Sequence, residues 1–262
     1  MRSPAKSLIK AVVLGLASLS GVPLTAVQST DACPQATTEP VVENLIRSNL
    51  ARARALPAYQ STRTYRVDYR GFPGSRSAEM IVDVKFEPPG NKVFVVRSQT
   101  GSKLIIDRVF KKLLESEKEA SDAENQKRNA LNHENYDFKL LNCESWPAGL
   151  MYVLEVAPKT KSKYLYRGKI WVDARDFAVY RISAEPAKNP SFWIKQTQIE
   201  QVYAKVRDFW LPASNRSSTS VRLGGHADFS IEYKDYQLTA SSPIVTGVET
   251  SPVQAGSPHP RK

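Results

Sequence analysis

Hydrophobic and polar residues alternate along most of the chain, which is the period of a β-strand with one buried face. Between residues 61 and 98 the alternation predicts three consecutive strands separated by turns rich in Gly and Pro. It resumes at residue 136 and predicts further strands over residues 136–141, 150–156, 164–172, 178–184, 193–206, 217–223 and 227–238. Because the turns are short, we expect one large antiparallel sheet of about ten or eleven strands.

Two segments have the period of a helix instead. In residues 39–56, Val42, Leu45, Ile46 and Leu50 recur at helical spacing, and Pro57 ends the pattern. Residues 104–132 begin with an apolar face and continue as a charged stretch, which predicts one long helix with an exposed end. A sheet this long must curl, and helices are its natural cover. The predicted fold class is therefore α+β, with a large curved antiparallel sheet and helices on its concave face.

The N-terminus has the three-part layout of a secretory signal peptide. Three basic residues, Arg2, Lys6 and Lys10, precede an apolar run over residues 11–19, and small residues follow. The apolar run is shorter than the about 20 residues of a membrane-spanning helix. We therefore expect cleavage and export, with an uncleaved N-terminal anchor as the alternative.

This pattern divides the chain into three parts. Residues 1–30 form the signal peptide, residues 31–238 the folded domain, and residues 239–262, rich in Ser, Pro, Gly and Thr, a disordered tail.

Composition and charge narrow the class of partner. Of the 262 residues, 41% are hydrophobic and 24% are charged, as in ordinary globular proteins. Lys and Arg number 37 against 26 Asp and Glu, which gives a formal net charge of +11. This charge permits anionic partners. Because export is expected and no aromatic-plus-basic recognition motif is present, we exclude nucleic acid.

Export also decides how the two cysteines are interpreted. In an oxidising compartment, Cys33 and Cys143 are expected to pair and to join the N-terminal arm to the middle of the domain. The alternative is two unrelated buried thiols. The sequence has no Cys-x-x-Cys and no Cys/His cluster, so it predicts neither a zinc site nor any other cofactor.

The sequence offers no recognisable catalytic centre. It contains no nucleophile elbow, phosphate-binding loop or dinucleotide fingerprint. His133 lies at a predicted helix end, His226 in a hairpin turn and His259 in the tail. The acidic residues between positions 115 and 124 have basic neighbours at helical pairing distance, which indicates a solvated face. We therefore expect a non-enzymatic protein with no catalytic residue and no metal.

The apolar positions of the strands are the remaining candidates for a binding site. Under the helical cover they form either an apolar cavity or a packed core, and periodicity alone does not separate the two. The cavity candidates are Tyr65, Val67, Tyr69, Met80, Val82, Val84, Phe86, Tyr152 and Leu154. Three other large residues, Trp171, Trp210 and Leu211, are expected to be structural.

Three segments resemble the periplasmic lipoprotein-carrier family of LolA/LolB-like outer-membrane lipoprotein-sorting proteins. Residues 168–182 place Trp-Val-Asp before a turn between two strands, residues 206–212 end in Trp-Leu-Pro, and residues 228–236 form a closing strand. The order of export signal, helix, three strands, helical lid and remaining strands is also similar. The resemblance implies a half-open β-barrel whose concave face holds acyl chains. By itself it assigns no residue to the arginine that latches this family's lid.

Together these features predict a monomeric, exported periplasmic carrier of a lipid, an acyl chain or an acylated lipoprotein, working with membrane-associated donor or acceptor proteins. The alternative is an envelope stress-sensing or assembly module that has the same fold and carries no cargo.

Overall fold

A computed structural model describes most of the chain between residues 36 and 239. The described ranges are 36–121, 123–162, 164–189, 194–222 and 224–239. They all belong to one compact unit, residues 33–262. The predicted signal peptide, Cys33 and the predicted tail beyond residue 239 lie outside the described residues. The three predicted parts of the chain therefore stay predictions.

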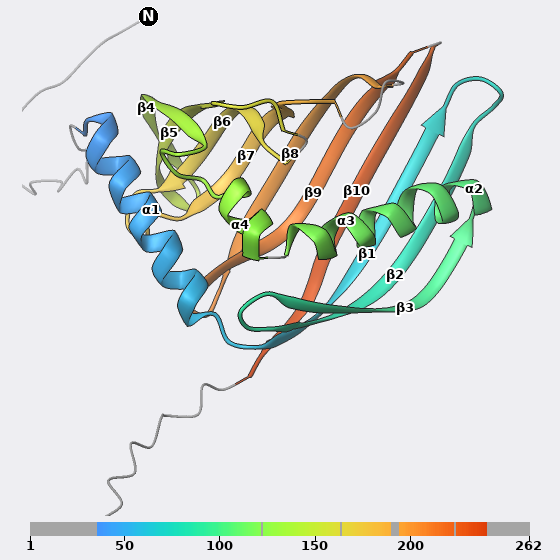
Figure 1. The fold of residues 1–262 in the computed structure, drawn as a ribbon, viewed down its shortest axis with the longest axis horizontal. Coiled ribbons are helices and arrows are strands. Elements are labelled where there is room, and N and C mark those ends of the chain that lie inside the picture. Colours follow the sequence, from blue (N-terminus) through green and yellow to red (C-terminus); the bar gives the residue numbers. More distant parts are fainter. Residues whose placement is uncertain (1–35, 122, 163, 190–193, 223, 240–262) are drawn as a thin grey trace, which may run out of the picture. The chain divides into compact units, whose positions relative to one another are not determined.

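The described residues form one open antiparallel sheet of ten strands (Figure 1). This confirms the predicted α+β class and the strand number. The strands are β1 (Tyr59–Arg70), β2 (Arg76–Glu87), β3 (Asn91–Gly101), β4 (Tyr136–Trp146), β5 (Gly149–Pro158), β6 (Tyr166–Asp173), β7 (Val179–Pro186), β8 (Ile194–Val206), β9 (Phe209–Val221) and β10 (Gly225–Leu238).

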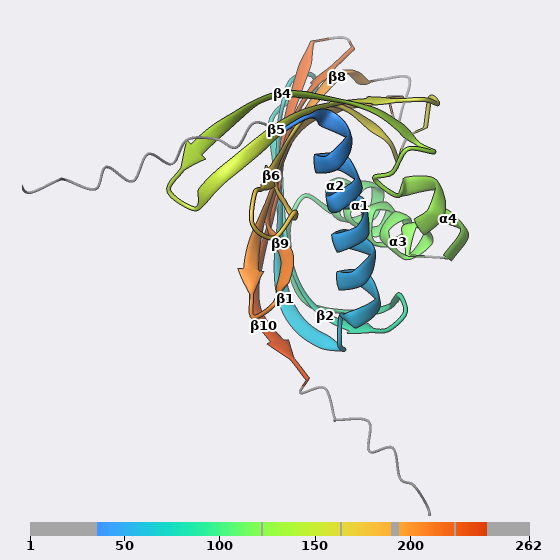
Figure 2. The same ribbon diagram turned by 90° about the vertical axis from the view of Figure 1, so that its left-hand side faces the viewer.

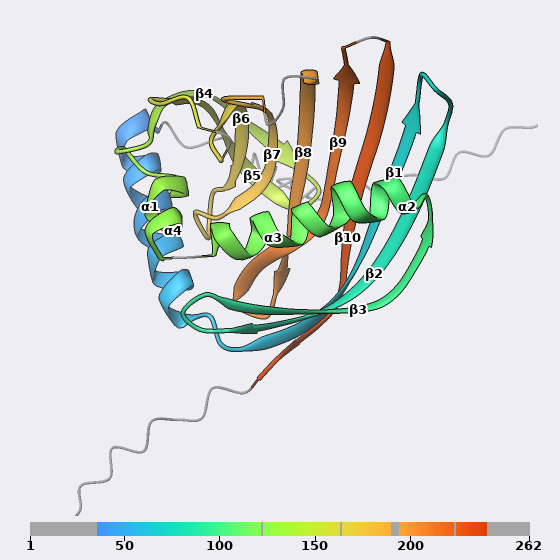
Figure 3. The ribbon, with the colours of Figure 1, turned by 45° about the vertical axis from the view of Figure 1, so that its right-hand side comes forward.

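The strand order shows why the sheet needs a helical crossing. The order is β3-β2-β1-β10-β9-β8-β7-β6-β5-β4, so the first strand pairs with the last, with Tyr65 opposite Ile231. The two edges are β3 and β4, which follow each other in the sequence. The segment between them must therefore cross from one edge to the other. Figures 1 and 3 show it running over one face of the sheet, and Figure 2 shows the sheet curving around the helices.

The second of the two predicted helices differs from the structure. Helix α1 (Thr38–Ala55) is confirmed, but the predicted helix over residues 104–132 is divided into α2 (Lys103–Ile105), a π-helical turn (Ile106–Phe110), α3 (Lys111–Ala120) and α4 (Ala123–Asn129). Side chains of α4 donate to carbonyl groups at the end of α3 and just after it. Asn125 Nδ2 donates to the Glu119 carbonyl and Gln126 Nε2 to the Ser121 carbonyl, each at 2.8 Å.

Strand boundaries also differ from prediction, and the start of β9 differs most. Strand β9 begins at Phe209 and not at residue 217, and it pairs with β8 from Val206 onward. Residues 209–211 are all apolar and residues 214–216 are all polar, so the start of β9 does not alternate between the two classes.

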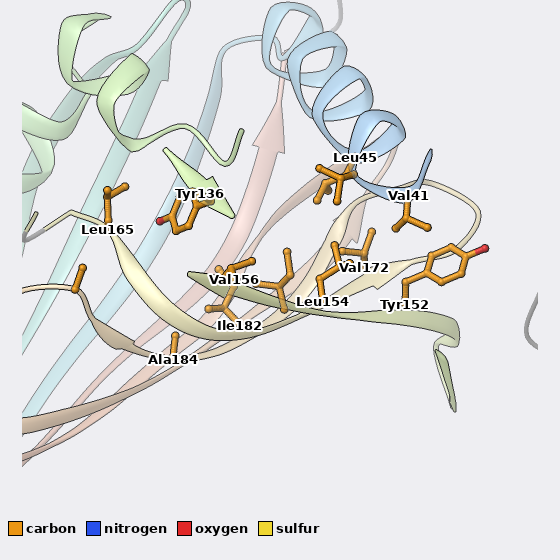
Figure 4. Packing of buried hydrophobic residues seen from close by; sticks show 13 residues of the cluster. Val41, Leu45, Tyr136, Tyr152, Leu154, Val156, Leu165, Val172, Ile182 and Ala184 are labelled. Atoms are coloured by element: carbon orange, nitrogen blue, oxygen red, sulfur yellow. The ribbon is translucent and has the colours of Figure 1, made fainter. Parts of the chain in front are cut away.

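Helix α1 covers one half of the concave face. Its residues Val41, Val42 and Leu45 are buried against β4 to β7 (Figure 4). The predicted fourth member of this face, Leu50, is half exposed. The inward face instead continues through Asn49, Arg52 and Leu56, which line a cleft described below.

The segment α2–α3 covers the other half. Ile105 and Phe110 are buried against Tyr65, Val67, Met80, Val82 and Val84, which lie on β1 and β2. A π-helical turn between Ile105 and Phe110 brings residues five positions apart toward the same side. Both side chains therefore reach the sheet.

A smaller cluster lies on the opposite face, where Met151, Val153 and Trp171 are buried with Trp146 and Tyr180 packed against them. Trp171 is thus buried, and its structural role stays a prediction. Leu211 is also buried, in a cluster with Tyr59, Phe86 and Leu238.

Candidate functional site

A cleft of about 380 Å³ opens on the concave side between α1, the end of α4 and strands β6 to β9. Its walls are mostly apolar, and its volume is in the range of small-molecule sites, roughly 300–1,000 Å³. The lining residues are Asn49, Arg52, Ala53, Leu56, Asn129, Leu131, Tyr166, Val179, Ile182, Tyr203, Phe209, Trp210 and Leu211. A β-bulge between Val202 and Tyr203 bends β8 beside the cleft.

Two phenols give the apolar cleft polar contact points. Burial raises the pKa of Tyr203 to about 12 and raises the pKa of Tyr166 well above its ordinary value. Both hydroxyl groups therefore stay protonated at neutral pH and can donate a hydrogen bond. Asn129 Oδ1 is buried and has no hydrogen-bond partner among the described residues. The cleft thus suits an apolar ligand that carries a few hydrogen-bonding groups.

Arg52 fixes one wall of the cleft. Its guanidinium donates to the carbonyl oxygens of Asp176 and Phe177 and to Asn49 Oδ1, each at 2.7 Å. These bonds tie α1 to the turn between β6 and β7, so the spacing between helix and sheet is set by directed contacts as well as by packing.

A buried ion-pair network holds α3 against the sheet. Arg63, on β1, is 2% exposed, and its Nη1 donates to both carboxylate oxygens of Glu117 at 2.8 Å. Lys92, on β3, donates to the same carboxylate at 2.9 Å. The Arg63 guanidinium also lies 4.9 Å from the ring centre of Tyr233. We call Arg63, Lys92 and Glu117 the latch.

The charges of the latch stabilise one another. Burial alone raises the pKa of Glu117, but the attraction of Arg63 and Lys92 and their hydrogen bonds outweigh it, so the pKa lies below its ordinary value of 4.5. Glu117 is therefore ionised at neutral pH. Arg63 shares the inward face of β1 with Tyr65 and Val67, and a charged residue at an inward position is the sequence signal that could have revealed the latch.

The nine predicted cavity residues fall into separate groups. Five of them pack under α2–α3: Tyr65, Val67, Met80, Val82 and Val84. Phe86 packs against Tyr59, whereas Tyr152 and Leu154 lie under α1.

The ninth, Tyr69, is half-buried and donates to the Phe72 carbonyl at 2.8 Å. None of the nine is among the described residues that line the cleft. A ligand role for the nine stays a prediction, and for the five residues under α2–α3 it requires that segment to move.

A serine, a histidine and an aspartate meet on the β9–β10 hairpin without forming a catalytic triad. His226 Nε2 lies 2.9 Å from Ser218 Oγ and 3.0 Å from Asp228 Oδ1. In a triad the aspartate bonds to one ring nitrogen of the histidine and orients the ring. The other ring nitrogen takes the proton of the serine hydroxyl. Here both contact the same nitrogen. This cluster therefore lacks the geometry for nucleophilic catalysis.

The predicted disulfide is a testable feature of the arm that precedes α1. Cys143 is half-buried on β4, and no cysteine among the described residues is free. Thiol labelling of the denatured, unreduced protein should find no reactive thiol if Cys33 and Cys143 are paired. Two labelled thiols per chain would contradict the pairing, and labelling after reduction is the positive control.

Part of the chain is similar to one known protein family. A model of a family of unknown function (DUF5686) matches residues 127–236. No curated protein matches.

Within the described ranges, no helix is both long and apolar enough to cross a membrane.

Several solved structures are similar at low identity, and their matches concern the fold. A candidate outer membrane lipoprotein-sorting protein domain from Vibrio parahaemolyticus is 12% identical, with a TM-score of 0.41 over 80% of this chain and 95% of that one. A LolA superfamily protein from Nitrosomonas europaea is 12% identical, with a TM-score of 0.34 over 79% and 96%. MucB in its complex with MucA from Pseudomonas aeruginosa is 10% identical, with a TM-score of 0.27 over 77% and 100%. The chain is thus similar to these structures at low identity.

Proposed function

We propose that this protein is a non-enzymatic, exported binding protein for a lipid or an acyl chain. The cleft between α1, α4 and β6 to β9 carries the proposal, because it combines apolar walls with the Tyr166 and Tyr203 hydroxyl groups. An acyl chain would remove the apolar walls from water, and the phenols would donate to an ester or carboxyl oxygen at its end.

Movement of α2–α3 would extend this site. The residues beneath it, which include Met80, Val82 and Val84, form a continuous apolar surface that Phe110 covers. A bound acyl chain could take the place of Phe110 and Ile105, exchanging one apolar contact for another. The latch is a polar contact that has to break before α3 can move away, so it adds to the free energy of opening.

The proposal also names the cargo and the cellular compartment. We propose an acylated lipoprotein or a lipid as the cargo and the periplasm as the site of action, with the predicted signal peptide as the means of export. Native mass spectrometry of protein taken directly from the periplasm should show a bound lipid. N-terminal sequencing of the same sample should give a start between residues 25 and 31.

The test of the cleft uses two alanines of α1 that differ in position. Ala53 lines the cleft and Ala55 does not, and both are exposed. Ala53→Trp should fill the cleft and weaken binding of a fluorescent fatty acid at least about tenfold, equivalent to about 1.4 kcal/mol. Ala55→Trp should bind like wild type. Equal binding by both variants and wild type would show that the probe does not use the cleft.

A second candidate function is a protein-interaction module, and the edge strand β3 favours it. Val93, Val95 and Val96 are 45%, 53% and 42% exposed on a strand whose outer side is unpaired in the sheet. Exposed apolar edge strands are sites for pairing with another chain. A stable partner captured from envelope extracts without lipid, and lost in Val95→Lys, would favour this function over lipid carriage.

A further inference from the structure

Two carboxylates and an imidazole meet where α1 passes the segment that leads into β4. Glu39 and Glu43 are one turn apart on α1, and His133 follows the end of α4. His133 Nε2 lies 3.1 Å from Glu43 Oε1 and 3.6 Å from Glu39 Oε1. One ligand atom from each residue lies within 4.8 Å of the other two. The two distances from His133 Nε2 are close to the about 3.4 Å between ligand atoms in a tetrahedral site whose bonds are about 2.0–2.2 Å long.

The three side chains are held by different elements. The helix fixes the spacing of the two glutamates. The His133 ring packs edge-on against Phe138, with centroids 5.6 Å apart and an interplanar angle of 77°, and the His133 carbonyl accepts from Lys159 Nζ at 2.5 Å. His133 therefore meets the helix from a position that its neighbours determine.

The charge around this cluster is unbalanced. No lysine or arginine within the described ranges forms an ion pair with Glu39 or Glu43, although the chain as a whole is strongly basic. Within the described part of the chain, the basic side chain paired with the two carboxylates is the His133 imidazole. A divalent cation would neutralise both carboxylates and accept the imidazole lone pair.

We propose that Glu39, Glu43 and His133 bind one Zn²⁺ ion, with water completing a tetrahedral shell. Zn²⁺ fits a set of imidazole nitrogen and carboxylate oxygen ligands, and three protein ligands plus water is a common arrangement. The ion would join α1 to the segment after α4. Residues of both, Ala53 on α1 and Leu131 just before His133, line the cleft. Bound zinc would therefore fix the distance between two walls of the cleft.

The test is metal binding by the full chain, purified without a histidine tag and stripped of metal. Isothermal titration with Zn²⁺ should give one site per chain with a micromolar or lower Kd, and Co²⁺ should give the intense visible spectrum of a tetrahedral site. Glu43→Gln and His133→Ala should each weaken Zn²⁺ binding at least about tenfold, the loss expected from removing a ligand. His226→Ala is the matched control, because His226 pairs with Asp228 far along the chain from this cluster.

A second readout separates binding at this site from loss of folding. Zn²⁺ should raise the Tm of wild type and of His226→Ala but not that of Glu43→Gln, whose exposed side chain leaves the fold intact. Absence of saturable binding in wild type would overturn the proposal. So would equal Zn²⁺ affinity in wild type, Glu43→Gln and His133→Ala. Since metal binding is measured without lipid, this outcome is distinct from failure of the lipid-binding proposal.

Discussion

Phe110→Ala should destabilise the domain by about 3–5 kcal/mol, the range for removing a fully buried aromatic ring. Phe110 is 0% exposed and packs with Tyr65 at a centroid distance of 6.2 Å. It is the largest side chain through which the α2–α3 segment contacts the sheet. Denaturant unfolding measures the loss in free energy, and hydrogen exchange should show faster exchange in residues 103–120.

The control is the preceding residue on the same turn. Val109 is 40% exposed, so Val109→Ala should change the free energy of unfolding by less than about 1 kcal/mol. If the two variants were equally stable, Phe110 would not anchor the segment in solution. If Phe110→Ala left the sheet stable while residues 103–120 exchanged freely, the segment would be a separately opening lid, which favours the carrier over the interaction module.

Glu117→Gln should destabilise the closed position of α3 by about 3 kcal/mol, because it leaves the buried Arg63 guanidinium without its anionic partner. The amide keeps the shape of the side chain, so the change isolates its charge. Thermal unfolding measures the loss. Glu115→Gln is the matched control on the same helix, since Glu115 is exposed, and its Tm should match that of wild type.

The same variant tests the charge of the latch through pH. A carboxyl group whose pKa is lowered by folding stabilises the protein above its unfolded pKa and loses that contribution as pH falls through the folded value. For Glu117 the difference in Tm between wild type and Glu117→Gln should be full above pH 4.5 and should shrink below it. A difference that is constant from pH 7 to pH 3 would show that Glu117 is not ionised in the latch.

The strands were predictable from the sequence wherever one face is buried and the other is exposed to solvent. On β1, Tyr65 and Val67 alternate with polar residues because successive side chains point to opposite faces. The same period failed at the start of β9, where residues 209–211 are all apolar and residues 214–216 are all polar. The two-residue alternation also did not predict that β5 is buried on both faces over Met151 to Leu154.

The candidate site was less predictable than the fold. The apolar residues of β1 and β2 were identified correctly as inward, but the helical segment fills the space above them. The cleft lies instead over β6 to β9, where Asn49 and Arg52 replace the expected apolar face of α1. The sequence of a single strand predicts which of its faces is inward. It does not predict whether a helix covers that face.

By itself the sequence determined the local elements of this protein: strands from a period of two, α1 from a helical period, and turns from Gly and Pro. Only the tertiary structure decided the pairing of β1 with β10, the crossing of α2–α3, the latch and the cluster of Glu39, Glu43 and His133. Arg63 and Glu117 are 54 positions apart, and Glu43 and His133 are 90 apart. Periodicity is a property of neighbouring residues, whereas these contacts depend on which surfaces the strand order and the crossing helices bring together.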